Sequence, residues 1–246
     1  MVVRGELNAE ARVLSRRLGL LCVLLGALVL GWLAWRGHSS TAQNKVLPAP
    51  IIVKEPVNFA RRTFDPANPP AEMPSLPAGE NAECDSNFIS NASVAGQPER
   101  IDATHATVTI TQIKVTLQLN ITIWVPEGVS QHVMDHEEGH REISESYYET
   151  ADQLAGRIAS TYVGKQVVVT GNDLDGEINK SLQQIGGEIT EEFDKELNPN
   201  PTQLLYDSIT DHSRNEVVAA DAVAHALKNG SIEAPQPSGT DPLANP

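Results

Sequence analysis

Cysteine and aromatic residues are both scarce in this chain. Of its two cysteines, Cys22 lies in an apolar N-terminal segment, which leaves Cys84 as the only thiol in the remainder. An intramolecular disulfide outside that segment is therefore excluded. Phe, Trp and Tyr together account for 4% of the residues, so a folded core has to be built mainly from Ile, Val, Leu and Ala. Stability must come from that aliphatic core, and from a metal ion if one binds.

Basic residues are few as well. The chain holds 18 Lys and Arg against 32 Asp and Glu, a formal charge of −14. Residues 1–36 contain five Arg and two Glu, so their +3 leaves −17 for residues 37–246. A body this acidic repels the phosphate backbone, which argues against nucleic acid as a partner. Nothing in the sequence indicates an oligomeric state.

One uncharged apolar run, residues 18–35, is long enough to cross a bilayer. Its 18 residues would span about 27 Å as a helix. Four arginines precede it, which predicts a cytoplasmic N-terminus at residues 1–17 and an extracytoplasmic remainder. A cleaved signal peptide, cut near residues 40–42, is the alternative. We favour an uncleaved transmembrane anchor because the apolar cores of signal peptides are usually only about 7–15 residues long.

Proline density sets the expected domain limits. Residues 36–80 contain eight prolines, which predicts an extended linker, although a short strand near residues 51–53 or 57–59 could still dock onto the body. Residues 81–228 are expected to form the folded domain. Residues 229–246, again rich in proline, are expected to be a disordered tail.

Alternating hydrophobicity predicts β-structure in the first part of this domain. Apolar residues occupy every odd position from Ile113 to Val125, whereas Val108 and Ile110 occupy even positions. The register therefore changes near Thr111, and residues 106–125 form either two strands or one long bent strand.

Helical periodicity follows. Apolar residues and two histidines recur at spacings of three and four from near Ser130 to Tyr162, which predicts one long helix. A strand is expected at residues 167–170 and a second long helix at residues 173–197, which residues 198–201 (Asn-Pro-Asn-Pro) should end. A last helical stretch is expected around residues 217–227. The predicted fold class is α+β, a small antiparallel sheet followed by two long helices.

The first helix carries the segment His136-Glu137-Glu138-Gly139-His140. Histidines four residues apart lie on one helical face, about 6 Å apart, so both imidazoles can bind one Zn²⁺. Glu137 is placed to act as a general base on a water molecule. This is the H-E-x-x-H pattern of zinc peptidases.

The third protein ligand is less evident. Catalytic zinc usually has three protein ligands. Glu188 or Glu192 on the second long helix could supply one. We favour His212, because it follows a helix break, in a loop where a ligand could be aimed inward.

The segments His136–His140 and Tyr206-Asp207-Ser208-Ile209-Thr210-Asp211-His212 together resemble a bacterial family of predicted secreted zinc-dependent proteases, long catalogued as a domain of unknown function. The resemblance covers roughly residues 85–228. It implies a zincin-like fold with His136, His140 and His212 as zinc ligands and Glu137 as the general base. It further implies that Tyr206 and Asp207 bind the transition state or orient a ligand histidine. Ser213 replaces the glycine that usually follows the last histidine of that motif.

The sequence thus predicts a zinc peptidase anchored in a bacterial inner membrane by a single N-terminal helix. Its catalytic domain would lie in the periplasm or outside the cell and would hydrolyse amide bonds of peptides or proteins. The alternative is a non-catalytic zinc-binding or interaction module of the cell envelope, or a pseudoenzyme. The sequence does not specify the substrate.

Overall fold

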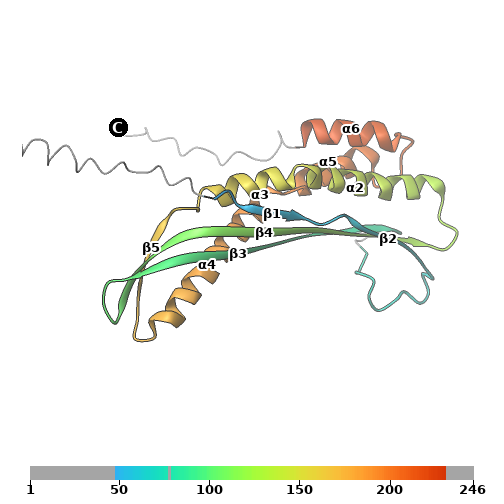
Figure 1. Ribbon diagram of the computed structural model, residues 1–246. Helices are drawn as coiled ribbons and strands as arrows, with labels where there is room; N and C mark the ends of the chain where they lie inside the picture. Colours follow the sequence, from blue (N-terminus) through green and yellow to red (C-terminus); the bar gives the residue numbers. More distant parts are fainter. Residues whose placement is uncertain (1–47, 77–78, 231–246) are drawn as a thin grey trace, which may run out of the picture. The chain divides into compact units, whose positions relative to one another are not determined.

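The computed structural model describes residues 48–76 and 79–230. They form an α+β fold in which helices pack on a five-stranded sheet (Figure 1). The strands are β1 (Ile51–Lys54), β2 (Asn58–Phe64), β3 (Glu83–Arg100), β4 (His105–Pro126) and β5 (Gln166–Thr170). The helices are α2 (Gln131–Glu149), α3 (Ala151–Ser160), α4 (Leu174–Glu196), α5 (Asn200–Thr210) and α6 (Ala219–Asn229).

Strand β4 is the axis of the sheet, because every other strand pairs with it. β3 runs antiparallel along one edge of β4. Along its opposite edge, β4 pairs with three strands. Its residues 105–109 pair with β5, residues 114–117 with β1 and residues 120–126 with β2. β1 and β2 are parallel to β4, so the sheet is mixed, and the prediction of an antiparallel sheet is wrong in this respect. Hydrophobic alternation identifies a strand but does not give its direction.

The predicted change of register in β4 is a bulge. Ala95 pairs with Gln112 and Gly96 with Ile110, which leaves Thr111 between them as the extra residue. The side chains before and after the bulge therefore point to the same face of the sheet. Of the two alternatives that the sequence left open, the single long strand is confirmed.

That face of β4 forms the core with the helices. Its residues from Ile110 to Ile121 are buried together with side chains of α2, α3 and α4 (Ile110, Ile113, Val115, Leu117, Leu119, Ile121; Tyr148, Ala151, Ala155, Ile158, Ile185, Ile189, Phe193). The intervening residues of β4, from Lys114 to Thr122, are polar and exposed or half-buried. The helices thus cover one face of the sheet.

The predicted helices are present, with two differences. α2 begins as expected, with Ser130 as its N-cap, but the expected single helix is interrupted at Thr150, where α3 starts. α4 agrees with the prediction. The Asn-Pro-Asn-Pro segment ends α4, yet a new helix, α5, starts within it at Asn200. Pro201 is tolerated there because the first turn of a helix needs no partner for its N–H groups.

The predicted N-terminus (1–17) and anchor (18–35) lie outside the described residues, as do residues 231–246 of the predicted tail. Within residues 48–76 and 79–230, no helix has the length and hydrophobicity needed to cross a bilayer. The segment treated as a linker contains β1 and β2, so the folded body starts before residue 81. Both docking strands that the sequence allowed are formed.

Candidate metal centre

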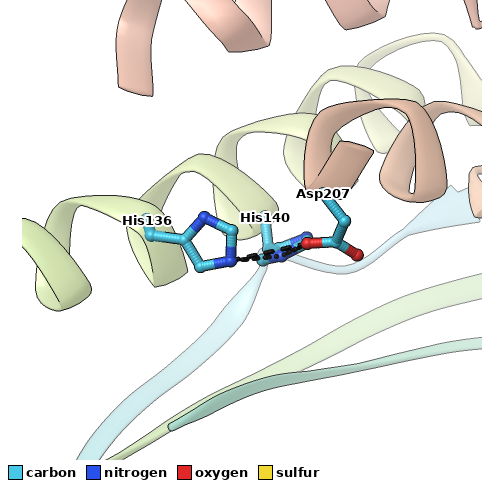
Figure 2. A group of neighbouring side chains, drawn as sticks. All are labelled: His136, His140 and Asp207. Carbon is cyan, nitrogen blue, oxygen red and sulfur yellow. Dashed lines mark hydrogen bonds and ion pairs between the residues drawn. The ribbon is translucent and has the colours of Figure 1, made fainter. Parts of the chain in front are cut away.

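Three potential metal ligands converge between helices α2 and α5. His136 and His140 lie one turn apart on α2, and Asp207 projects toward them from α5 (Figure 2). The two Nε2 atoms are 3.2 Å apart, and Asp207 Oδ1 lies 2.9 Å from His140 Nε2 and 3.4 Å from His136 Nε2. The side chains of the three residues are 7%, 15% and 18% exposed, respectively. This is a compact and mostly buried group of ligand atoms.

The spacing of these atoms fits one ion. A tetrahedral ion with bonds of 2.0–2.1 Å separates its ligand atoms by about 3.3–3.4 Å. Asp207 Oδ1 is buried and has no well-formed hydrogen bond among the described residues, although two imidazole nitrogens lie beside it. A metal ion between these electron-rich atoms, or a proton on one of the imidazoles, would offset their mutual repulsion. The group His136, His140 and Asp207 could hold a metal ion.

The side chain of Gln203 on α5 fixes the tautomer of His140. Its Nε2 donates to the main-chain oxygen of His140 (3.1 Å) and to Ser144 Oγ (3.0 Å). Its Oε1 lies 2.6 Å from His140 Nδ1 and must therefore accept a hydrogen bond from it. A proton on Nδ1 leaves the lone pair of Nε2 free in the neutral ring. His140 is thereby oriented as a metal ligand.

Tyr206 packs α5 onto α2 at the same place. Its ring stacks on that of His136, with centroids 5.0 Å apart, and its hydroxyl donates to the main-chain oxygen of His136 (3.1 Å). A Cβ at Gly139 would lie 2.2 Å from this hydroxyl. The glycine in the middle of α2, which costs about 1 kcal/mol relative to Ala, is therefore explained by the close approach of Tyr206.

Burial and charge act against each other within the group. Burial lowers the pKa of His136, and Asp207 only partly offsets this. At His140, burial also favours a lower pKa, but Asp207, Gln203 and Glu137 together outweigh it and raise the pKa. Burial would raise the pKa of Asp207, yet the two imidazoles hold it well below its usual range. The carboxylate is thus ionised and available to a cation, and a proton competes with a metal for His140.

Glu137 lies beside the group and is 4% exposed. Burial raises the pKa of its carboxyl to about 7, a shift that His140 opposes and the nearby Glu80 and Asp207 reinforce. Within the described residues, no side chain donates a hydrogen bond to this carboxylate. A buried, unpaired carboxyl group next to two ligands is well suited to exchange a proton.

His212 lies next to the group but is not a member of it. Its Nδ1 is 2.9 Å from Glu80 Oε1 and 3.7 Å from Asp207 Oδ1. It sits in a turn after α5 in which Asp211, His212 and Ser213 all have positive φ (47°, 51° and 63°). Three successive non-glycine residues in the left-handed region are unusual and often mark functional sites.

The remaining candidates lie apart from the group. Glu188 and Glu192 are on α4, where Glu188 accepts from Gln184 and Glu192 from Tyr162. Burial raises the pKa of Cys84 to about 12, so its thiol stays protonated at neutral pH. Neither a glutamate of α4 nor Cys84 belongs to the metal-ligand group that the described residues form.

From the sequence, Asp207 is expected to act in catalysis and His212 to bind the metal, whereas no role is expected for Gln203 or Glu80. The structure brings Asp207 to the two imidazoles and pairs His212 with Glu80. Gln203, Tyr206 and Asp207 follow the i, i+3, i+4 spacing of one helical face. That pattern was the available signal, but it has meaning only once residues 200–210 are known to be helical.

Comparison with known proteins adds no assignment: no family model, curated protein or solved structure matches the chain. The geometry of the site therefore provides the grounds for its function.

Proposed function

We propose that this protein is a zinc-dependent peptidase that cleaves amide bonds with the help of Glu137. The convergence of His136 Nε2, His140 Nε2 and Asp207 Oδ1 within 2.9–3.4 Å carries the proposal. Two imidazoles and one carboxylate are a ligand set that suits zinc and leaves room for a further ligand. The similarity of the two motif segments to predicted secreted zinc-dependent proteases supports the same conclusion. The packing of the H-E-x-x-H helix on a sheet is compatible with the zincin-like fold that this resemblance implies.

Each residue then has a defined task. His136, His140 and Asp207 hold the ion, which supplies Lewis acidity toward a water molecule and a substrate carbonyl. Glu137 accepts the proton of the attacking water and delivers it to the leaving amine. Gln203 positions His140, and Tyr206 positions His136 by stacking and by its hydrogen bond to the main chain. In this proposal, His212 is a neighbour of the ligands and Asp207 takes the third ligand position.

The proposed location follows from the N-terminal sequence. An uncleaved apolar segment at residues 18–35 would anchor the chain in a bacterial inner membrane and place the peptidase domain in the periplasm or outside the cell. Its substrates are then peptides or proteins of that compartment, and the membrane is reached only through the anchor.

The test measures zinc content and peptide hydrolysis on the full chain, purified in detergent. We expect about one zinc per chain in the wild type. Asp207→Asn and His136→Ala should lose the zinc, whereas His212→Ala should keep it. Glu137→Gln should keep the zinc but lower hydrolysis of a peptide pool by about 100-fold or more, because proton transfer typically contributes 10²–10⁴ to the rate.

Two outcomes would contradict the proposal at different levels. Full zinc content with unchanged hydrolysis in Glu137→Gln removes the catalytic role and leaves a non-catalytic zinc module. Zinc that is lost in His212→Ala but retained in Asp207→Asn reverses the assignment of the third ligand. Glu145→Gln is a matched control, because Glu145 lies on α2 two turns beyond Glu137 and pairs with Arg141.

A further inference from the structure

A large cavity lined mostly by apolar residues lies at the start of helix α2. Its volume is about 600 Å³. The loop after β2, the turn from β4 into α2 and the first turn of α2 form its walls. Phe64, five prolines, Met73 and Val133 are among the lining residues, and Glu127 is the only charged one among the described residues. A cavity of this size falls within the range of about 300–1,000 Å³ that is typical of small-molecule sites.

Two lining residues of the cavity, Val133 and Asn81, are neighbours in the chain of residues at or beside the candidate metal centre. Val133 precedes His136 by three residues and Glu137 by four, so their Cβ atoms are about 5–6 Å apart on one face of α2. Asn81 also lines the cavity and directly follows Glu80, whose carboxylate lies 2.9 Å from His212 Nδ1. A molecule held at the metal centre would therefore have the cavity within reach of its adjacent side chains.

The lining determines which side chain would be favoured there. A large aliphatic or aromatic side chain gains free energy when it leaves water for such a site. An Asp or Glu side chain would lose its hydration there without meeting a counter-ion, and a Lys or Arg side chain would find only the carboxylate of Glu127, an exposed residue. The cavity thus discriminates by polarity as well as by size.

We propose that this cavity is the specificity pocket of the enzyme and takes a large apolar side chain, such as that of Leu or Phe, next to the cleaved bond. The inference rests on the proposed peptidase function and adds the substrate class to it. Peptides with a charged or small residue at this position are then poor substrates.

The experiment uses internally quenched peptide pools that differ at one position, which is Leu, Phe, Gln, Lys or Glu. The full chain in detergent, loaded with Zn²⁺, should cleave the Leu and Phe pools roughly 10–100 times faster in kcat/KM than the Gln pool, as expected for burial of one large apolar side chain. Met73→Lys should lower this preference about tenfold and favour Glu, and Met73→Glu should favour Lys. The matched controls are Val168→Lys and Val168→Glu on β5, where the side chain is 73% exposed.

A second readout separates this inference from the function on which it rests. The same peptides, labelled with a fluorophore, are titrated into zinc-loaded Glu137→Gln protein and followed by anisotropy. Cleavage without an apolar preference, or Met73 variants that behave like the Val168 controls, would overturn the specificity pocket and leave the peptidase intact. Absence of cleavage together with Met73-dependent binding of the Leu peptide would overturn catalysis and keep the pocket as a peptide-binding site. If neither cleavage nor selective binding is found, both conclusions fail.

Discussion

A single amide side chain, that of Gln203, sets the state of a ligand at the candidate metal centre. Because the main-chain oxygen of His140 can only accept, the Gln203 amide has one orientation, and its oxygen faces His140 Nδ1. The protonated nitrogen of the imidazole then points away from the metal ligands, and its lone pair points toward them. A contact that does not itself involve the candidate ligand atoms would thus decide whether His140 can bind an ion.

Gln203→Leu is therefore expected to weaken zinc binding by about 10–100-fold, the usual effect of losing a partner of a ligand histidine. Gln203→Glu, which keeps an acceptor for Nδ1–H, should stay within about tenfold of the wild type. Competition with a chelating dye measures both affinities. Gln153→Leu, an equivalent change at an exposed position of α3, should leave the affinity unchanged. Equal affinities for Gln203→Leu and the wild type would remove the positioning role of Gln203.

At the scale of single residues, the sequence predicts those contacts that are made between residues close together in the chain. His136 and His140 can be assigned to one site because four residues on a helix return to the same face, whatever the rest of the fold does. The approach of Asp207 depends on how α5 packs on α2, through Tyr206 against Gly139. No spacing along the chain encodes that packing, so the third ligand could not be chosen from the sequence between Asp207, His212 and the glutamates of α4.

Among the elements, helix α4 shows how two adjacent glycines can have opposite effects. A Cβ at Gly186 would lie 2.5 Å from the main-chain oxygen of Ala92 on β3, whereas a Cβ at Gly187 would meet nothing within 4 Å. Gly186 allows the helix to approach the strand closely, and Gly187 only weakens the helix.

We expect Gly186→Ala to lower the free energy of unfolding by about 1–3 kcal/mol, because the methyl group overpacks the contact with β3. Gly187→Ala should raise it by up to about 1 kcal/mol through helix propensity. Urea denaturation followed by circular dichroism at 222 nm compares the two variants. A loss of stability in Gly187→Ala, or none in Gly186→Ala, would show that α4 does not approach β3 as described.

The start of a helix or the position of a bulge could be predicted where it depends on residues next to it in the chain. The shift from even to odd apolar positions located the bulge at Thr111, and Ser130 marked the start of α2. The break between α2 and α3 at Thr150 does not disturb the spacing of three and four between apolar residues, so hydrophobic periodicity could not reveal this break. The start of α5 was hidden for the opposite reason, since Pro201 is read as a helix breaker although a first turn accommodates it.

For the molecule as a whole, a metal ion would join two elements that are distant in the sequence. Zinc at a free concentration 100 times its Kd would stabilise the folded chain by about 2.7 kcal/mol, which corresponds to roughly 5–10 °C in Tm for a domain of this size. We therefore expect EDTA to lower the Tm measured by differential scanning fluorimetry, and added zinc to restore it. His136→Ala should show no such dependence. A Tm that EDTA leaves unchanged in the zinc-loaded protein would contradict an ion shared by α2 and α5.

At the same scale, composition misled the prediction in one region. Proline density marked residues 36–80 as a linker, yet residues 51–54 and 58–64 are proline-free and complete the sheet as β1 and β2. They are short, and their partner β4 lies about 60 residues further on. The sequence allowed strands there but could not give their parallel pairing, because nothing local specifies it.

The position of β4 in the sheet also has a consequence for the order of folding. β1, β2 and β3 all emerge from the ribosome, or from a translocation channel, before the strand to which they bond. None of them can form its ladder until residues 106–126 have followed, so the nascent chain stays without a sheet until about that length. Among the described strands, those in the stretch that precedes β4 therefore wait for their partner during synthesis.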